Sequence, residues 1–89
     1  MRYTPTLYQQ TLAMIRKAKE SGTPELAFDA LKKMEFIEGK QSPSGLTKTF
    51  TGREGYNVVF VEYQPEQRLF CVKHLAENET LAFEEVSFD

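Results

Sequence analysis

The sequence predicts a two-layer α+β fold, in which an N-terminal helical hairpin packs on a four-stranded antiparallel β-meander. Apolar residues recur at helical spacing over about the first 36 residues, and from Leu46 onward they alternate with polar ones at the period of a strand. Turn residues interrupt the second half at short intervals, which favours hairpins. At 89 residues the chain is long enough for a single domain, 1–89, and too short for two.

Two helices are expected, over about 5–21 and about 24–36. Thr4 suits the N-cap of the first helix, with Pro5 at the first helical position, and a Thr-Pro pair repeats this signal at residue 23. Gly22 lies between the helices and suits the left-handed residue that follows a helix. A linker this short predicts a helical hairpin or a helix-turn-helix corner.

Four strands are expected after a loop at 39–45 that is rich in glycine, serine and proline. They are placed at about 46–51, 56–63, 68–75 and 80–88. The first two are joined by a predicted turn at 52–55, which contains two glycines. Strands this close in sequence form an antiparallel meander.

The turn expected at 64–67 sets the register of the sheet, because a tight turn pairs Val61 with Phe70. One face then carries the apolar residues that the helices are expected to cover: Val59, Val61, Phe70, Val72, Leu81 and Phe83. The other face carries a second apolar set broken by charges: Tyr56, Val58, Phe60, Leu69, Cys71 and Val86, with Glu62, Lys73 and Glu84.

A sheet with one face in water alternates more cleanly than this second face does. Three interpretations follow. In the first, the helices wrap part of both faces, or the expected register is wrong by one residue. In the second, the face is an apolar patch that binds a partner or a second copy. In the third, the face borders a small-molecule pocket.

The formal net charge of −2 conceals an uneven distribution. Residues 1–55 carry nine Lys and Arg against six Asp and Glu, whereas residues 56–89 carry two against seven. The sheet half is therefore acidic and would suit a basic partner surface. A lone cysteine, no apolar leader and no apolar run of membrane length predict a cytoplasmic protein without a membrane partner.

The sequence offers little catalytic or metal-binding chemistry. Cys71 and His74 are three residues apart on one strand, so their side chains point to opposite faces and cannot form a dyad. One cysteine and one histidine are too few for a soft metal site, and Glu84 and Glu85 straddle the sheet. We therefore expect no enzymatic activity, no cofactor and no metal.

The predicted function is a non-enzymatic protein–protein interaction module. Its partner would be another protein with a basic surface, a second copy of the chain, or both. By analogy with small acidic domains of phages and mobile elements, its role would be that of an inhibitor or regulator. The residues expected to bind are Tyr56, Phe60, Glu62, Leu69, Glu84 and Glu85.

The alternative function is a nucleic-acid-binding domain that uses the helix-turn-helix-like corner at residues 5–36, with the following hairpin as a wing. Its phosphate contacts would come from basic residues, namely Lys17, Lys19, Lys32, Lys33, Lys40 and Arg53. Against it, the second helix opens with Glu25 and contains Asp29, and the whole chain lacks a basic footprint.

Overall fold

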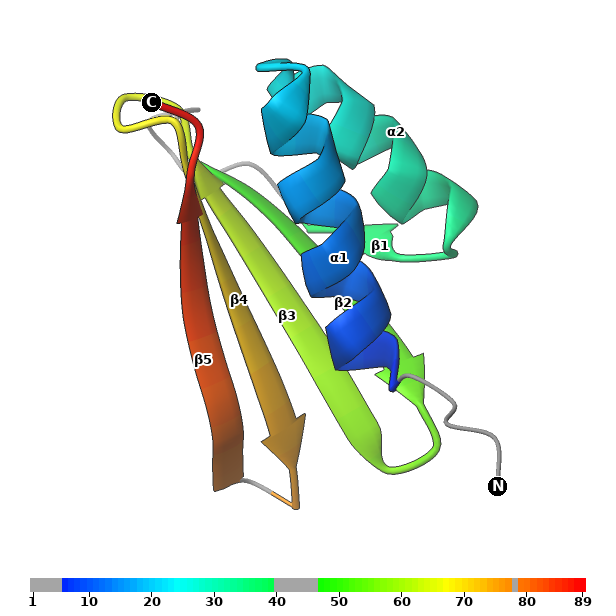
Figure 1. Cartoon of the computed structure of the whole chain (residues 1–89). Coiled ribbons are helices and arrows are strands. Elements are labelled where there is room, and N and C mark those ends of the chain that lie inside the picture. Colours follow the sequence, from blue (N-terminus) through cyan, green and yellow to red (C-terminus); the bar gives the residue numbers. More distant parts are fainter. Residues whose placement is uncertain (1–5, 40–46, 78) are drawn as a thin grey trace, which may run out of the picture.

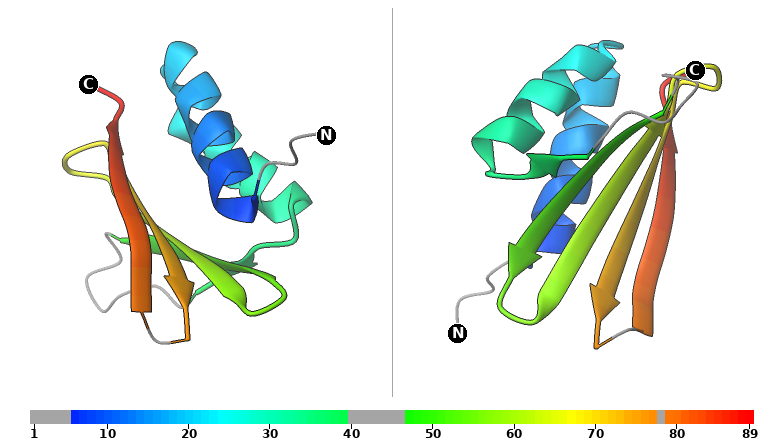
Figure 2. Two further views of the ribbon diagram at one scale, coloured as in Figure 1. Left: turned by 60° about the horizontal axis from the view of Figure 1, so that its bottom comes forward. Right: turned by 180° about the vertical axis from the view of Figure 1, so that it is seen from behind.

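The computed structural model describes residues 6–39, 47–77 and 79–89. It contains two N-terminal helices and an antiparallel sheet of five strands in the order β1-β2-β3-β4-β5, so the predicted α+β class is confirmed. Both helices lie on the same face of the sheet, and no described helix covers the other face (Figures 1 and 2). Among the described residues, the sheet therefore has one covered and one uncovered surface.

Helix α1 spans Leu7–Glu20 and begins later than expected. The Thr6 hydroxyl accepts from the Gln9 N–H at 3.2 Å, and the Gln9 side chain accepts from the Thr6 N–H at 2.9 Å. This reciprocal capping box makes Thr6 the N-cap; the expected cap, Thr4, lies outside the described residues. Gly22 has a φ of 68°, as predicted for the residue after the helix.

Helix α2 spans Pro24–Lys33 and ends before Phe36, which we expected it to include. Glu35 adopts a left-handed φ of 67°. Its N–H donates to the Lys32 carbonyl at 3.0 Å. The Phe36 N–H donates to the Leu31 carbonyl, also at 3.0 Å. This is the Schellman arrangement, formed with glutamate at a position where glycine is usual.

Glu35→Gly is therefore expected to raise the unfolding free energy by about 1 kcal/mol, because glycine reaches a positive φ without the steric cost of a Cβ. Asp29→Gly, in the middle of α2, is a control that removes the same charge, and it is expected to destabilise because glycine weakens a helix interior. Urea unfolding of the unaltered protein and the two variants measures the sign of each change in unfolding free energy. A loss of stability in Glu35→Gly would contradict the helix end described here.

A fifth strand, β1, follows α2 directly and was missing from the expected set of four. It consists of Ile37–Glu38 and pairs with β2 at Thr51 and Phe50. Two residues are too few to show an alternation of polar and apolar side chains, so the pattern in the sequence cannot reveal this strand.

The other four strands form the expected meander. Their bounds are Lys48–Glu54 for β2, Asn57–Gln64 for β3, Leu69–Ala76 for β4 and Glu79–Ser87 for β5. The predicted turn at 52–55 is wrong, because β2 continues to Glu54. Only Gly55 and Tyr56 separate β2 from β3, and Gly55 has a φ of 62°, which a two-residue hairpin requires at this position. Apart from Gly39, the predicted loop at 39–45 lies outside the described residues.

The register of β3 with β4 differs by two residues from the expected one. Val61 pairs with Val72, and Tyr63 with Phe70, because the connection occupies 65–68 and not 64–67. A shift of two residues leaves every side chain on its expected face.

The register of β5 departs from the expected one by a single residue. Leu75 pairs with Thr80 as a tight turn requires, but a bulge between His74 and Leu75 shifts all later pairs by one. Phe83 therefore pairs with Lys73 on the uncovered face, and Glu84 pairs with Val72 beneath the helices. The expectations that Leu81 and Phe83 are core residues and that Val86 is not are wrong: Leu81 and Phe83 are about half exposed and Val86 is buried.

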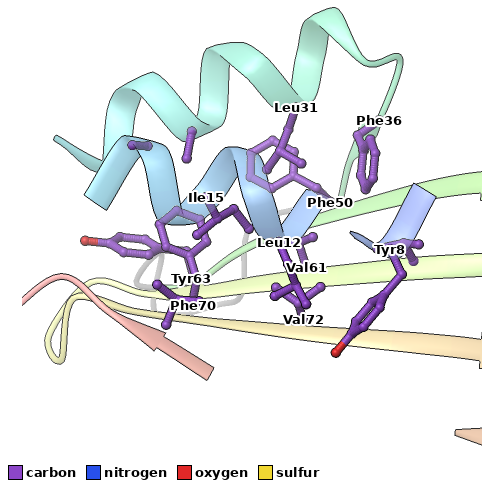
Figure 3. Close-up of a cluster of buried hydrophobic side chains, with 14 of the residues drawn as sticks. Tyr8, Leu12, Ile15, Leu31, Phe36, Phe50, Val61, Tyr63, Phe70 and Val72 are labelled. Atoms are coloured by element: carbon purple, nitrogen blue, oxygen red, sulfur yellow. The ribbon is translucent and has the colours of Figure 1, made fainter. Parts of the chain in front are cut away.

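The core fills the space between the helices and the covered face of the sheet (Figure 3). Its largest fully buried apolar members come from α1, α2 and the three central strands: Ile15, Leu31, Phe50, Val59, Val61, Phe70 and Val72. The ring of Phe28 on α2 lies 5.2 to 5.8 Å from the rings of three sheet aromatics, Phe50, Tyr63 and Phe70. This cluster holds α2 on the sheet.

Candidate protein-binding surface

The outer face is defined here as the side of the sheet that points away from the helices. Directly paired residues of neighbouring strands lie side by side on one face, so the register arranges the side chains in rows. The central row crosses all five strands and consists of Ile37, Thr51, Phe60, Lys73 and Phe83. The acidic row lies beside it and consists of Thr49, Glu62, Cys71 and Glu85.

Apolar side chains dominate the central row and the end of the sheet beyond it. Ile37 is 74 % exposed and Phe83 is 48 % exposed. Beyond the central row, a hollow of about 330 Å³ is lined by Tyr56, Val58, Leu75, Ala76 and Glu77. The outer face thus combines projecting apolar side chains with a depression that could receive one.

The acidic row places a cysteine between two carboxylates. The Cys71 thiol lies 3.7 Å from the Glu85 carboxylate, and Glu62 pairs with Cys71 from the other side. Burial, followed by the charges of Glu85 and Glu62, raises the pKa of the Cys71 thiol, and Lys73 opposes this only weakly. The thiol therefore stays protonated at neutral pH and is a poor nucleophile.

Five of the six residues expected to bind a partner lie on the outer side. Phe60, Glu62 and Glu85 belong to its two rows, Leu69 pairs with Gln64 and Ser87 beside the acidic row, and Tyr56 lines its hollow. The sixth, Glu84, does not, because the bulge in the β4–β5 ladder turns its side chain toward the helices, where it forms an ion pair with Arg16 of α1. The predicted position of Glu84 on the outer face is therefore wrong.

Sequence reasoning missed three apolar residues of this surface, Ile37, Leu75 and Phe83. Leu75 shares a face with Leu69 by simple alternation, so that signal was present in the sequence. Ile37 depends on the two-residue strand β1, and Phe83 depends on the bulge. Neither of these leaves a readable pattern.

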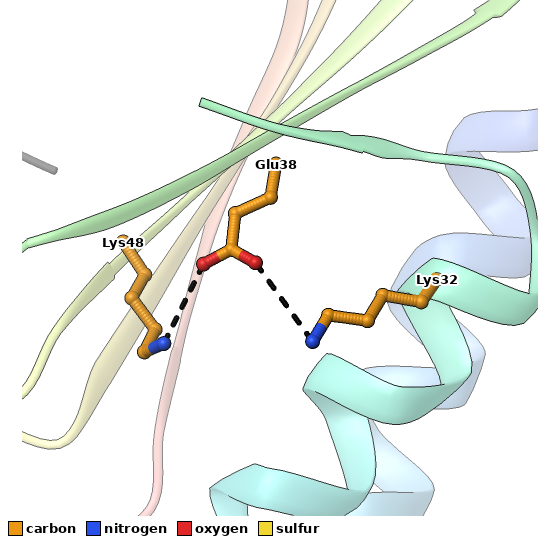
Figure 4. A network of polar contacts seen from close by, with 3 residues as sticks. All are labelled: Lys32, Glu38 and Lys48. Carbon is orange, nitrogen blue, oxygen red and sulfur yellow. Dashed lines mark hydrogen bonds and ion pairs between the residues drawn. The ribbon is translucent and has the colours of Figure 1, made fainter. Parts of the chain in front are cut away.

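Several acidic residues of the chain form ion pairs away from the outer face. Glu38 lies 3.8 Å from the Lys32 ammonium and 3.5 Å from that of Lys48, on the helix side (Figure 4). Asp89 lies 3.5 Å from the Arg68 guanidinium. The outer face and its hollow hold three acids and two bases, namely Glu62, Glu77, Glu85, Arg53 and Lys73. This surface is apolar with nearly balanced charges.

The described basic residues of the alternative function are divided between the two helices and the sheet. Lys17 and Lys19 belong to α1, and Lys32 and Lys33 to α2. Arg53 pairs with Val58 on the outer face, on the opposite side of the sheet. Lys40 lies outside the described residues. The arrangement does not favour a nucleic-acid groove.

Cys71 and His74 point to opposite faces, as predicted. His74 stacks on Tyr8 at 5.3 Å beneath α1, and its Nε2 lies 3.1 Å from the Asn57 side-chain oxygen.

Within the described ranges, no three His, Cys, Asp or Glu residues come together as metal ligands would. No described helix has the length and apolar character needed to cross a membrane. Comparisons with protein-family models, curated proteins and solved structures found no significant match.

Proposed function

We propose that this chain is a non-enzymatic protein-binding module whose binding surface is the outer face of the sheet. The observation that carries the proposal is the central row, which places Phe60 and Phe83 on a face that no described helix covers. Ile37 ends this row at the edge of the sheet, where it lines a hollow with Leu7 and Met34 of the helical side. A contiguous apolar sheet face gains free energy when a partner removes it from water.

The shape and charge of the outer face indicate what such a partner offers. A sheet face is broad and shallow, and it is matched best by another flat surface, as in β-sandwich packing. Balanced charges favour a partner that carries both signs near an apolar centre. The outer face carries only one acid more than it carries bases, so its charge gives little weight to the expected basic partner surface.

The chemistry of the titratable groups supports binding over catalysis. The sheet separates Cys71 from His74, the imidazole that could activate it, and the Glu85 carboxylate that lies 3.7 Å from the thiol is a weaker base than an imidazole. The raised pKa of the Cys71 thiol further reduces its reactivity. A module of this kind acts by covering a partner's surface, which is the action of an inhibitor or a regulator.

The test is affinity capture with the intact chain and three variants, from an extract of the cells that naturally make the protein. Phe60→Glu and Phe83→Glu each place a charge in the central row, and both are expected to weaken binding of a captured protein at least ~10-fold, because the charge would be buried at the interface. Leu26→Glu is the control, because Leu26 is 49 % exposed on α2, on the other side of the sheet.

Binding is then measured with purified components by calorimetry, after circular dichroism has shown that each variant is folded. A captured protein that binds Phe60→Glu and Phe83→Glu as tightly as the unaltered chain would contradict the proposal. So would binding that only Leu26→Glu abolishes, since the helical side would then be the interface.

A further inference from the structure

We propose that the outer face binds a second copy of this chain, related by a two-fold axis that runs across the strands between the central row and the acidic row. This inference rests on the proposed function, for which it names the partner. Three features of the face support it: the alternation of charge between the two rows, the apolar hollow at one end of the face, and the size of the face.

Within the described part of the chain, the charges of these two rows lack ion-pair partners of opposite sign. The ion pairs there are those of Arg16 with Glu84, Lys32 and Lys48 with Glu38, and Arg68 with Asp89. None of them includes Lys73, Glu62 or Glu85. The Lys73 ammonium lies 6.0 Å from the centre of the Phe83 ring, and both residues that pair with Cys71 are acids.

A two-fold axis between the rows supplies partners of opposite sign. It lays the acidic row of one copy on the central row of the other, so that Lys73 faces Cys71 between the carboxylates of Glu62 and Glu85. These two carboxylates then lie opposite the rings of Phe60 and Phe83, and both must turn toward the Lys73 ammonium between them. Symmetry makes this contact twice. Sheets that pack face to face lie about 10 Å apart, a gap that an extended lysine side chain can largely span.

The other simple way to stack two copies is disfavoured by charge. A two-fold axis that runs along β4 places Glu62 opposite Glu85 of the second copy, and Lys73 opposite its own equivalent. Like charges held together in a desolvated contact are repulsive. The charge pattern therefore selects the axis across the strands.

The same axis also brings together two apolar features at opposite ends of the face. On β4, residues 69, 71, 73 and 75 point outward in succession, so a rotation that exchanges Cys71 with Lys73 also exchanges Leu69 with Leu75. Leu69 of each copy then lies over the hollow that Tyr56, Val58 and Leu75 form on the other. Apolar contact thus flanks the charged centre at both ends.

The size of the face suits a reversible dimer. Four strands about 4.8 Å apart and seven to nine residues long, at about 3.3 Å per residue, give a face of about 500 Å² in projection, to which the two-residue strand β1 adds little. Two copies together bury about 1,000 Å², near the lower end of the range for specific interfaces.

The experiment is sedimentation equilibrium over a wide range of concentration with charge-reversed variants. Lys73→Glu alone, and Glu62→Lys with Glu85→Lys, are each expected to weaken the dimer at least ~10-fold, because each creates repulsion at both symmetry-related contacts. An equimolar mixture of the two variants is expected to recover a heterodimer, since the carboxylate introduced into one chain then meets the two ammonium groups introduced into the other. Lys17→Glu, on the exposed side of α1, is the control and should leave the dimer unchanged.

Three results would overturn the inference: a monomer at millimolar concentration, a dimer that Lys73→Glu leaves intact, or a mixture that does not recover association. Each is distinct from failure of the proposed function. A monomeric chain that still captures another protein through Phe60 and Phe83 would retain the binding module and exclude only the second copy as its partner. A dimer that survives both Phe60→Glu and Lys73→Glu uses a different surface.

Discussion

Phe70→Ala is expected to lower the unfolding free energy by about 3–5 kcal/mol. The Phe70 side chain is fully buried, and its ring lies 4.6 Å from that of Tyr63, 5.2 Å from that of Phe88 and 5.8 Å from that of Phe28. Truncation of Phe70 opens a cavity among these rings, where α2 meets the sheet. Domains of this size have a total stability of about 4–13 kcal/mol, so the variant loses a large part of it.

Phe83→Ala is the matched control, because it removes the same side chain from the adjacent strand on the opposite face. Phe83 is 48 % exposed, and the expected loss is less than about 1 kcal/mol. Urea unfolding at low protein concentration, where self-association contributes little, measures both values. Equal losses in the two variants would show that the bulge does not turn Phe83 away from the core.

Gly52→Ala is expected to lower the unfolding free energy by about 1–3 kcal/mol, although glycine is usually the poorer residue in a strand. Gly52 is buried in β2 and pairs with Val59 on the covered face. A Cβ built on it would lie 2.6 Å from two atoms of the Phe36 ring, well inside van der Waals contact. The buried Phe36 side chain must shift to make room, and valine at this position should cost more than alanine.

The coupling between Gly52 and Phe36 makes this prediction specific. In the background Phe36→Ala the ring is absent, so Gly52→Ala should cost little or even stabilise, and the double-mutant cycle should give a coupling of more than about 1 kcal/mol. Thermal and urea unfolding of the four proteins provide the cycle. If Gly52→Ala costs the same with and without the Phe36 ring, the close contact between these residues is not the reason for the glycine.

Local sequence patterns predict the covered half of this fold well, because each depends on only a few neighbouring residues. Gly22, with its positive φ, ends the first helix as expected, and the Thr-Pro pair at residue 23 starts the second. Val59, Val61, Phe70 and Val72 face the helices as alternation predicts. The end of α2 was missed because its left-handed residue is Glu35, a residue type that gives no such signal.

The candidate surface is harder to predict, because it depends on the relative register of strands. Alternation along β3 and β4 places Phe60, Glu62 and Leu69 correctly, and an error of two residues does no harm there. On β5 a single extra residue exchanges the faces of the sheet on which Phe83 and Glu84 lie. The energy that favours the bulge comes from burying Val86 and pairing Glu84 with Arg16, which are tertiary contacts that no short window contains.

The unbroken strand order β1-β2-β3-β4-β5 has a consequence for how the chain folds. Every strand pairs with its neighbours in sequence, so the sheet can grow one hairpin at a time, without the entropic cost of closing a long loop. The exception is α1, whose contacts with β4 and β5 join the two ends of the chain. Docking of α1 is therefore the step with the largest loop-closure entropy. Until α1 docks, the newly formed meander has two apolar faces open to water. Each newly synthesised chain therefore passes through a stage in which both faces are exposed in the cell.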